Sequence, residues 1–272
     1  MPFHPRRLLS FLYEPGRWYD ANAWAYFRVA GIRDVVEMQA VNKFIVELKR
    51  RGLWLRMDRV WLCSPTSLRA ALICCKSLTT MTAYNDPTFS TTGIQFDGAT
   101  NFLDCNFNCS TQSDFMTSSN AHMSIYQRAN IALGVAETFF GSFQSAVPSR
   151  YAVIGKKNTD DFSCRMFSTT NFVGSVQTDF VGFYTQSRRS STDREIYKNT
   201  TSMGTQTTST TIAPSGARMC IGAQGTITLG TVSTYSNIEF AGATLGDGLT
   251  TAEVEYLYNA FQNYQTALGR EV

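Results

Sequence analysis

Two tyrosines, two arginines and an asparagine lie between residues 184 and 199, and side chains of these types bind sugars. An aromatic ring offers a flat apolar platform, while guanidinium and amide groups donate hydrogen bonds to hydroxyls and acidic groups. The candidate ligand-binding residues are Tyr184, Arg188, Arg189, Tyr197 and Asn199. A second interpretation stays open, in which the tyrosines pack within a sheet and the arginines only solubilise a turn.

The acidic residues lack the spacing of a glycoside hydrolase. A retaining enzyme places two carboxyl groups about 5 Å apart across one cleft. Asp193 and Glu195 come nearest, because residues two apart share one face of a strand, but no third acid follows them. We therefore predict that the chain is not an enzyme. Turnover of a polysaccharide that depends on these two acids would reverse this prediction.

Cofactor and metal motifs are missing from the sequence. There are two histidines, His4 and His122, and we interpret His122 as a structural residue of a strand. The sequence contains no Gly-Lys-Ser/Thr phosphate loop, no Cys-x-x-Cys pair and no Asp-x-Asp loop rich enough in oxygen for calcium. We predict no cofactor and no bound metal.

The cysteine count is odd, so at least one thiol is free or bonded to another chain. The seven are Cys63, Cys74, Cys75, Cys105, Cys109, Cys164 and Cys220. Cys164 and Cys220 fall within predicted strands, as small buried hydrophobic residues. Cys105 and Cys109 lie in a stretch rich in Asn and Ser, where side chains are often exposed. We predict these two as candidates for an inter-chain disulfide, formed only after assembly in an oxidising medium.

The composition is typical of a β-rich globular protein. The 272 residues are 43% hydrophobic, 13% aromatic and 17% charged, which excludes a disordered chain or a coiled coil. The net charge of +3 gives no reason to expect nucleic acid. No apolar run reaches the ~18 residues of a membrane span. Residues 1–13 have too short an apolar stretch for a signal peptide, so we expect an arm that docks on its own fold or on a neighbouring subunit.

Positive charge is concentrated near the N-terminus. Residues 1–80 hold 13 Lys and Arg against six Asp and Glu, a balance of +7, and the remainder has a balance of −4. The basic cluster comprises Lys49, Arg50, Arg51, Arg56 and Arg59. Cations are favoured at the C-terminus of a helix, which explains the cluster without a partner. The alternative is contact with an acidic partner, such as the C-terminal part of another copy.

The pattern changes from helical to strand-like near residue 85. Apolar residues at helical spacing predict helices within 20–51, with Asp20 as an N-cap, an interruption at Gly31, a second start near Asp34 and an end at Gly52. A short strand at 59–63 precedes a short helix that begins at Ser64-Pro65. The predicted domains are a helical N-terminal segment, 1–84, and a β domain, 85–272, which we expect to fold by itself.

Ten short runs rich in Val, Ile, Phe, Tyr and Thr predict strands in the β domain. They are 93–97, 101–105, 122–129, 137–143, 151–155, 162–167, 181–187, 195–198, 217–222 and 234–241. Because no helix separates them, they favour an antiparallel sandwich. The threonine-rich stretch 200–211 is left open between loop and strand. After a Gly-rich turn at 242–248, a capping box of Thr250 and Glu253 starts the terminal helix, and Gly269 ends it.

Five short motifs follow one another in the β domain. They are a Gly-Ile-Gln-Phe-Asp-Gly hairpin (93–98) leading to Phe-Leu-Asp (102–104), Glu-Ile-Tyr-Lys-Asn (195–199), Arg-Met-Cys-Ile-Gly (218–222), Ile-Glu-Phe (238–240) and Leu-Thr-Thr-Ala-Glu (249–253). In this order they resemble LamG-like domains of the concanavalin A-like lectin-glucanase superfamily, over residues 88–268. The resemblance implies a mainly β antiparallel jelly-roll sandwich, with an α-helical N-terminal segment and one C-terminal helix added here. It also implies sugar binding in many relatives.

The layout of helical segment, sandwich and terminal helix also resembles proteins of tailed phages, where such domains are usually on the virion surface. This implies a non-enzymatic bacteriophage virion surface protein, in a capsid decoration, neck or collar, or tail fibre. It would act through assembly with other virion proteins, as a homo-oligomer, after synthesis without a signal peptide in the host cytoplasm. The alternative is a carbohydrate-binding, lectin-like module that attaches to host-surface glycans.

Overall fold

The N-terminal helices begin where acidic residues cap them. The computed structural model describes residues 18–207 and 211–272, so the expected arm and the signal-peptide question lie outside the described residues. Asp20 and Asp34 accept hydrogen bonds from the amides of Asn22 and Glu37, both at 2.9 Å, and start α1 (Ala21–Ala30) and α2 (Val35–Arg50). Gly31 ends α1 with a positive φ of 74°. These caps confirm the sequence predictions.

The third helix starts later than predicted. Helix α3 (Leu68–Ala71) follows Ser67, whose hydroxyl accepts a hydrogen bond from the amide of Ala70 at 3.1 Å. The prediction of a start at Ser64 is wrong. The Ser64 hydroxyl donates to the carboxylate of Glu37 in α2 and accepts from the Thr66 amide at 3.2 Å, which closes a turn, and the helical hydrogen bonds begin only at Ser67. A single 3-10 turn, η2 (Trp54–Arg56), precedes the first strand.

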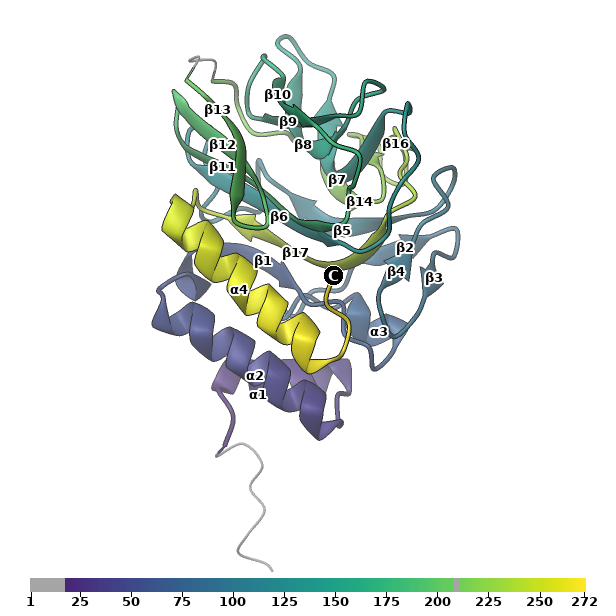
Figure 1. Ribbon diagram of the computed structural model, residues 1–272, viewed down its shortest axis with the longest axis vertical. Coiled ribbons are helices and arrows are strands. Elements are labelled where there is room, and N and C mark those ends of the chain that lie inside the picture. Colours follow the sequence, from purple (N-terminus) through teal and green to yellow (C-terminus); the bar gives the residue numbers. More distant parts are fainter. Residues whose placement is uncertain (1–17, 208–210) are drawn as a thin grey trace, which may run out of the picture.

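Two sheets packed face to face form a sandwich, which confirms the predicted fold class (Figure 1). The helix-facing sheet has the order β13-β12-β11-β6-β17-β4-β3, with β1 paired to β17. Its strands are β1 (Met57–Trp61), β3 (Thr88–Phe89), β4 (Ile94–Gln95), β6 (Ala121–Gln127), β11 (Gly182–Ser190), β12 (Asp193–Lys198), β13 (Thr201–Gln206) and β17 (Glu239–Gly246).

The outer sheet has the order β10-β9-β8-β7-β14-β5-β2, with the short β15 and β16 attached. Its strands are β2 (Thr82–Tyr84), β5 (Phe102–Asn108), β7 (Glu137–Gln144), β8 (Arg150–Lys156), β9 (Asp161–Met166), β10 (Phe172–Val176), β14 (Arg218–Ile221), β15 (Gln224–Gly225) and β16 (Val232–Ser233). Every pairing is antiparallel except the two-residue contact of β15 with β7. The main hydrophobic core lies between the two sheets.

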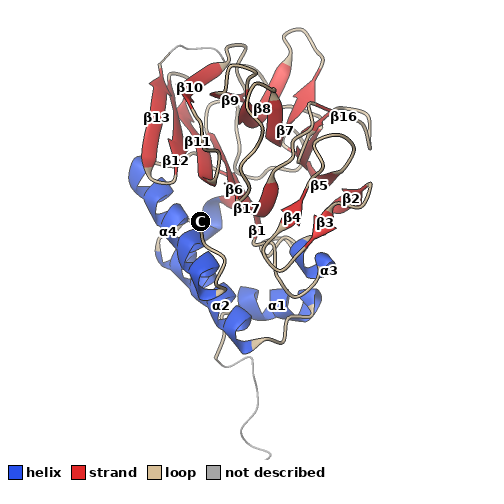
Figure 2. Ribbon diagram, turned by 45° about the vertical axis from the view of Figure 1, so that its right-hand side comes forward, coloured by secondary structure: helices blue, strands red, loops and turns tan. Residues whose placement is uncertain are grey.

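The helices cover only the helix-facing sheet, opposite the outer sheet (Figure 2). Helix α4 (Thr251–Ala267) lies between that sheet and α2, and its face is buried against both. The rings of Phe44 in α2 and Phe183 in β11 both lie 4.9 Å from the ring of Phe261. Thr250 and Glu253 form the predicted capping box. The terminal helix is therefore packed within the chain.

Two strand predictions are wrong, and one open stretch contains a strand. The threonine-rich stretch 200–211, open between loop and strand, contains β13, and its residues 208–210 lie outside the described residues. Strand β10 was missed, because its mostly exposed residues include Gly174 and show little apolar pattern. The last strand extends to Gly246, through much of the predicted turn. Gly242 and Gly246 serve a strand here, because a Cβ would lie 2.5 Å from the Phe261 ring at Gly242 and 2.3 Å from the Arg56 carbonyl at Gly246.

Residues before the predicted boundary at 84 contribute to both sheets. Strand β1 pairs with β17, and β2 pairs with β5. The side chains of Trp61 and Met81 belong to the core between the sheets.

No helix among the described residues is long and apolar enough to cross a membrane.

Candidate functional site

The five predicted ligand-binding residues do not share one exposed surface. Tyr184 and Arg188 are buried between the sheets, with the Tyr184 ring stacked on Phe162 at 4.4 Å. Tyr197 is buried on the other face of its sheet, against the start of α4, where its hydroxyl bonds to that of Thr251 at 2.9 Å. The ladder pairs Tyr197 with Thr185 and not with Tyr184. Since adjacent positions on a strand face opposite ways, this register separates the two tyrosines.

The remaining two members stand in structural roles. The Asn199 side chain accepts a hydrogen bond from the amide of Phe183 at 2.9 Å, in a turn where Asn199 has a φ of 57°. Arg189 pairs with Asp193 at 2.7 Å and with Glu195 at 3.1 Å. Tyr184 and Tyr197 are thus packed against the sheet, as in the second interpretation of the sequence.

The acid pair and the histidine do not form a hydrolytic centre. Arg189 holds both Asp193 and Glu195, and its hydrogen bond keeps the pKa of Asp193 below the usual range. Asp193 therefore stays ionised near neutral pH and is not prepared to donate a proton. His122 is buried between the carbonyl of Asp247 and the hydroxyl of Thr244, and burial lowers its pKa to about 4. Its neutral ring serves the packing of the helix-facing sheet.

The cysteines are buried, and none forms a disulfide within the chain. Cys105 in β5 and Cys109 just after it are 1% and 2% exposed, so the expectation of exposed thiols is wrong. The reason is that Cys105 and Phe107 point into the core, which a polar local sequence does not reveal. Burial raises the pKa of both thiols. Among the described residues, no three His, Cys, Asp or Glu side chains gather as a metal site.

A groove on the outer sheet collects aromatic and cationic side chains from predicted strands, together with the amide side chains of Asn171 and Gln224, which lie outside the predicted strands. Along β8 and β9 buried and partly exposed residues alternate, as expected of a sheet with one face on the core. Ala152, Ile154, Phe162, Cys164 and Met166 point inward. Tyr151, Val153, Ser163 and Arg165 therefore point outward and line the groove.

The groove has an aromatic and cationic end. The rings of Tyr151 and Phe143, opposite each other on β8 and β7, lie 4.7 Å apart. The guanidinium carbon of Arg165 lies 4.0 Å from the centre of the Tyr151 ring. Within the described part of the chain Arg165 makes no hydrogen bond or ion pair, and its Nε is buried without an acceptor. A cation stacked on a ring is thus left with unused donors.

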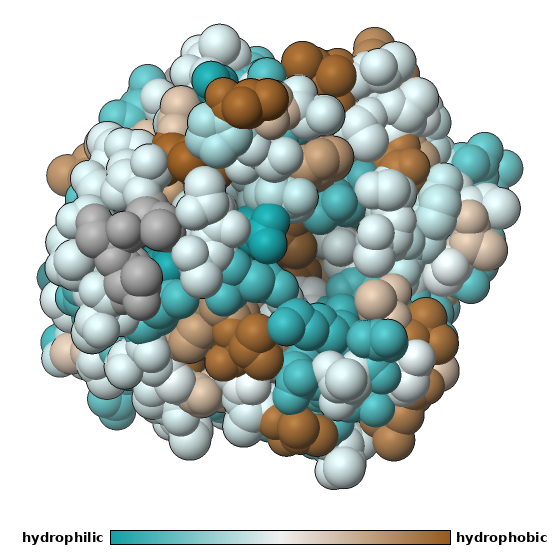
Figure 3. Space-filling model, turned by 90° about the horizontal axis from the view of Figure 1, so that it is seen from above, coloured by the Kyte–Doolittle hydropathy of each residue, from teal (hydrophilic) through white to brown (hydrophobic). Residues whose placement is uncertain are grey.

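The floor and walls of the groove are polar or small. Gly155 is part of the lining, and a Cβ there would come within 2.1 Å of the Glu137 carbonyl, so no side chain can stand at this position. Ser163 donates to the side-chain oxygen of Asn171 at 3.2 Å, and the amide of Gln224 lies on the wall. The volume is about 210 Å³. Figure 3 looks onto this side, which is hollowed and mainly hydrophilic, with separate hydrophobic patches.

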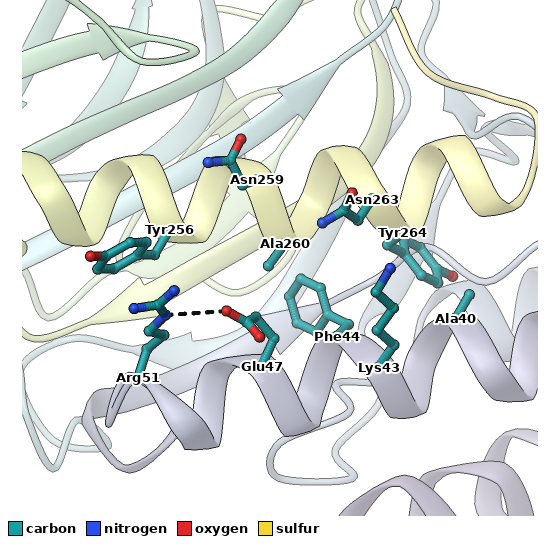
Figure 4. A pocket seen from close by; sticks show the side chains of 10 residues that line it. All are labelled: Ala40, Lys43, Phe44, Glu47, Arg51, Tyr256, Asn259, Ala260, Asn263 and Tyr264. Atoms are coloured by element: carbon teal, nitrogen blue, oxygen red, sulfur yellow. Dashed lines mark hydrogen bonds and ion pairs between the residues drawn. The ribbon is translucent and has the colours of Figure 1, made fainter.

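A second hollow of about 170 Å³ lies between α2 and α4 (Figure 4). Phe44 and Ala260 form its floor, and its charged walls largely satisfy one another. Arg51 pairs with Glu47 at 3.2 Å and stacks over the Tyr256 ring at 4.0 Å. The side chains of Lys43, Asn259 and Asn263 on its lining make no hydrogen bond or ion pair within the described residues, but the hollow holds no unpaired guanidinium.

The basic cluster is mostly paired within the chain. Lys49 pairs with Asp20 at 2.7 Å, and Arg50 and Arg51 pair with Glu47. Arg56 contacts both Asp247 and Glu253, near the start of α4, and Arg59 stacks over the Phe107 ring. These contacts account for the cluster without an external acidic partner.

The residues of the outer-sheet groove were missed because no motif marks them. The available signal was the alternation of Tyr151, Val153, Ser163 and Arg165 with core residues, which identifies one solvent-facing surface. That signal does not say which strands are neighbours. The order β9-β8-β7, which brings Arg165, Tyr151 and Phe143 together, is a property of the folded sheet.

Comparisons with known proteins show the fold. No protein-family model matches the sequence, and no curated protein matches it significantly. Trypanosoma rangeli sialidase, solved with 2,3-difluorosialic acid as a covalent intermediate, has a TM-score of 0.54 at 8% identity, over 81% of this chain and 38% of the sialidase. A mutant of that sialidase with trans-sialidase activity has a TM-score of 0.53 at 9% identity, over 84% of this chain and 40% of the mutant. The binding domain of botulinum neurotoxin serotype D has a TM-score of 0.52 at 8% identity, over 77% of this chain and 52% of that domain. This chain therefore spans about 40–50% of each of these chains.

Proposed function

We propose that this chain is a glycan-binding β-sandwich that attaches to a surface through the groove on its outer sheet. The observation that carries the proposal is the outward-facing set of Tyr151, Phe143 and Arg165 beside Gly155, a position where no side chain fits. A shallow, open hollow with a ring at one end and amides on its walls suits a flat ligand with many hydroxyl groups. The volume of about 210 Å³ is below the roughly 300–1,000 Å³ of pockets for drug-sized ligands, so the groove suits a small ligand.

The chemistry of the groove favours an acidic sugar. Arg165 has donors without partners, and guanidinium groups bind carboxylates and sulfates through paired hydrogen bonds. The one carboxylate on the lining, Glu137, already accepts hydrogen bonds from the Ser236 hydroxyl at 2.7 Å and the Asn237 amide at 3.2 Å. The groove therefore presents one unpaired cation and no unpaired acid.

Binding without turnover fits the same lining. Glycoside hydrolysis by the usual route needs two carboxyl groups, about 5 Å apart in retaining enzymes and farther apart in inverting ones. Glu137 has no second acid beside it on the groove lining. The proposal is therefore a binding module and not a hydrolase.

The test is a glycan array that includes uronic, sialylated and sulfated sugars beside neutral ones. We expect saturable binding to an acidic class, a loss of at least tenfold in Tyr151→Ala and Arg165→Gln, and no hydrolysis of the bound sugar. Tyr256→Ala, a half-buried tyrosine in the other hollow, is the matched control and should bind as the wild type does. The proposal fails if no glycan binds saturably, or if both groove variants bind as well as the control.

We also propose that the chain works on the surface of a phage virion, alongside other virion proteins and as a homo-oligomer. The support is the sequence resemblance, together with exposed apolar side chains on the helical side, away from the groove. Those are Trp18, Val29, Val35, Val36, Val46 and Leu55. Mass spectrometry of purified particles tests the location, and light scattering of the isolated chain tests the oligomer. A chain absent from particles would remove the virion setting without affecting the glycan proposal.

A further inference from the structure

Two arginines face each other inside the sandwich, on the strands β11 and β12 of the helix-facing sheet. Arg188 of β11 lies directly opposite Arg194 of β12, and both are fully buried. Directly opposed residues share one face of a sheet. That face is the inner one, because Tyr184 on the same side of β11 stacks on Phe162 of the outer sheet.

The two arginines are accommodated differently. Arg188 donates to the carbonyl oxygens of Met166 and Phe167 in the facing sheet, at 2.7 and 2.8 Å, and to the Thr211 hydroxyl at 2.9 Å. Arg194 has no such acceptors. Its Nε, Nη1 and Nη2 are all buried without a hydrogen bond, and it forms no ion pair within residues 18–207 and 211–272.

Neighbouring amides are also left without partners. The side-chain oxygen of Gln206, opposite Arg194 on β13, has none. Both amide atoms of Gln186, on the inner face of β11, have none either. Buried polar groups in native proteins are almost always satisfied, by protein, by water or by an ion. The unused groups of three neighbouring side chains therefore mark a place that suits a small bound polar species.

The positive charge of Arg194 determines whether water or an anion fits beside it. Burial lowers the pKa of Arg194 to about 10, so it stays protonated at neutral pH. An uncompensated buried ion destabilises a fold strongly, and a like charge directly opposite adds to the cost. Water would satisfy hydrogen bonds without balancing the charge, whereas an anion does both.

We infer that Arg194, with Arg188 and Gln186 beside it, forms an internal binding site for a small inorganic anion of halide size. The donors are Arg194 Nε, Nη1 and Nη2 together with Gln186 Nε2, and a single spherical acceptor can take several of them. Chloride is the expected occupant in ordinary media, with water bound to the amide oxygens of Gln186 and Gln206. The site would fasten β12 and β13 to the rest of the sandwich.

The test is the melting temperature of the full chain as chloride replaces gluconate at constant ionic strength. We expect a saturable rise of roughly 5–10 °C when chloride reaches about 100 times its Kd. Arg194→Met keeps the length of the side chain without its charge, and should abolish the rise. Arg69→Met, at an exposed arginine of α3, is the matched control and should keep it.

Three outcomes would overturn the inference. They are an equal melting temperature in chloride and gluconate, a chloride-dependent rise that persists in Arg194→Met, and a rise caused by phosphate and not by chloride. If Arg194→Met does not fold, crystals of the wild type grown in bromide decide the question. An anomalous peak beside the Arg194 guanidinium supports the site, and no peak there refutes it.

Discussion

Replacing Phe261 by alanine should destabilise the isolated chain strongly. Its ring is fully buried where α4 meets the helix-facing sheet, 4.9 Å from the rings of both Phe44 and Phe183. Gly242 of β17 lets this ring rest on the strand backbone, since a Cβ there would come within 2.5 Å of it. Removing the ring opens a cavity bounded by a helix, a strand and a second aromatic ring, and none of these can move in easily.

The magnitude follows from this confinement. Truncating a buried phenylalanine costs about 3–5 kcal/mol, and the upper part applies where neighbours cannot collapse. The whole free energy of unfolding of a typical domain is about 5–15 kcal/mol. At about 2–4 °C per kcal/mol for a chain of this size, the melting temperature should fall by roughly 6–20 °C.

The assay is a thermal melt followed by circular dichroism, with reversibility checked by rescanning. Leu55→Ala is the control, because that leucine is 72% exposed and its truncation should change stability by no more than about 0.5 kcal/mol. If Phe261→Ala melted within 2 °C of this control, the helix would not be held as described. An unchanged melt combined with loss of an oligomer would instead place the apolar face between subunits.

Three further predictions concern pH, truncation and oxidation. His122 has a pKa of about 4 when folded and about 6.5 when unfolded, so below pH 6.5 the unfolded chain binds more protons. Urea unfolding should therefore show stability falling by up to about 3 kcal/mol between pH 6.5 and 4, and an unchanged slope in His122→Asn would contradict this cause. Residues 85–272 alone should aggregate, because deletion of residues 1–84 removes β1 from its pairing with β17 and exposes the apolar face of α4. A soluble fragment that melts cooperatively would instead support a β domain that folds by itself. Reducing and non-reducing gels should give identical bands, since Cys105 and Cys109 are buried, and a dimer lost in Cys109→Ser would show otherwise.

Local features of this chain were readable from the sequence. The caps at Asp20, Asp34 and Thr250 involve residues two or three positions apart, so the interaction that starts each helix is contained in a few neighbouring letters. The sandwich class was readable for a related reason. Period-two runs without intervening helices leave antiparallel pairing as the way to bury their apolar faces.

The tertiary structure alone decided which side chains meet. A shift of one residue in register reverses the face of a strand, and the ladder that pairs Tyr197 with Thr185 put the two tyrosines of the predicted site on opposite faces. The same ladder placed Arg194 opposite Arg188 inside the sandwich, although either would pass for a surface residue in the sequence. The groove likewise depends on the order β9-β8-β7, which brings Arg165 to Tyr151 and Phe143. Strand order and register are set by the packing of the whole sheet, and no short stretch of sequence contains that information.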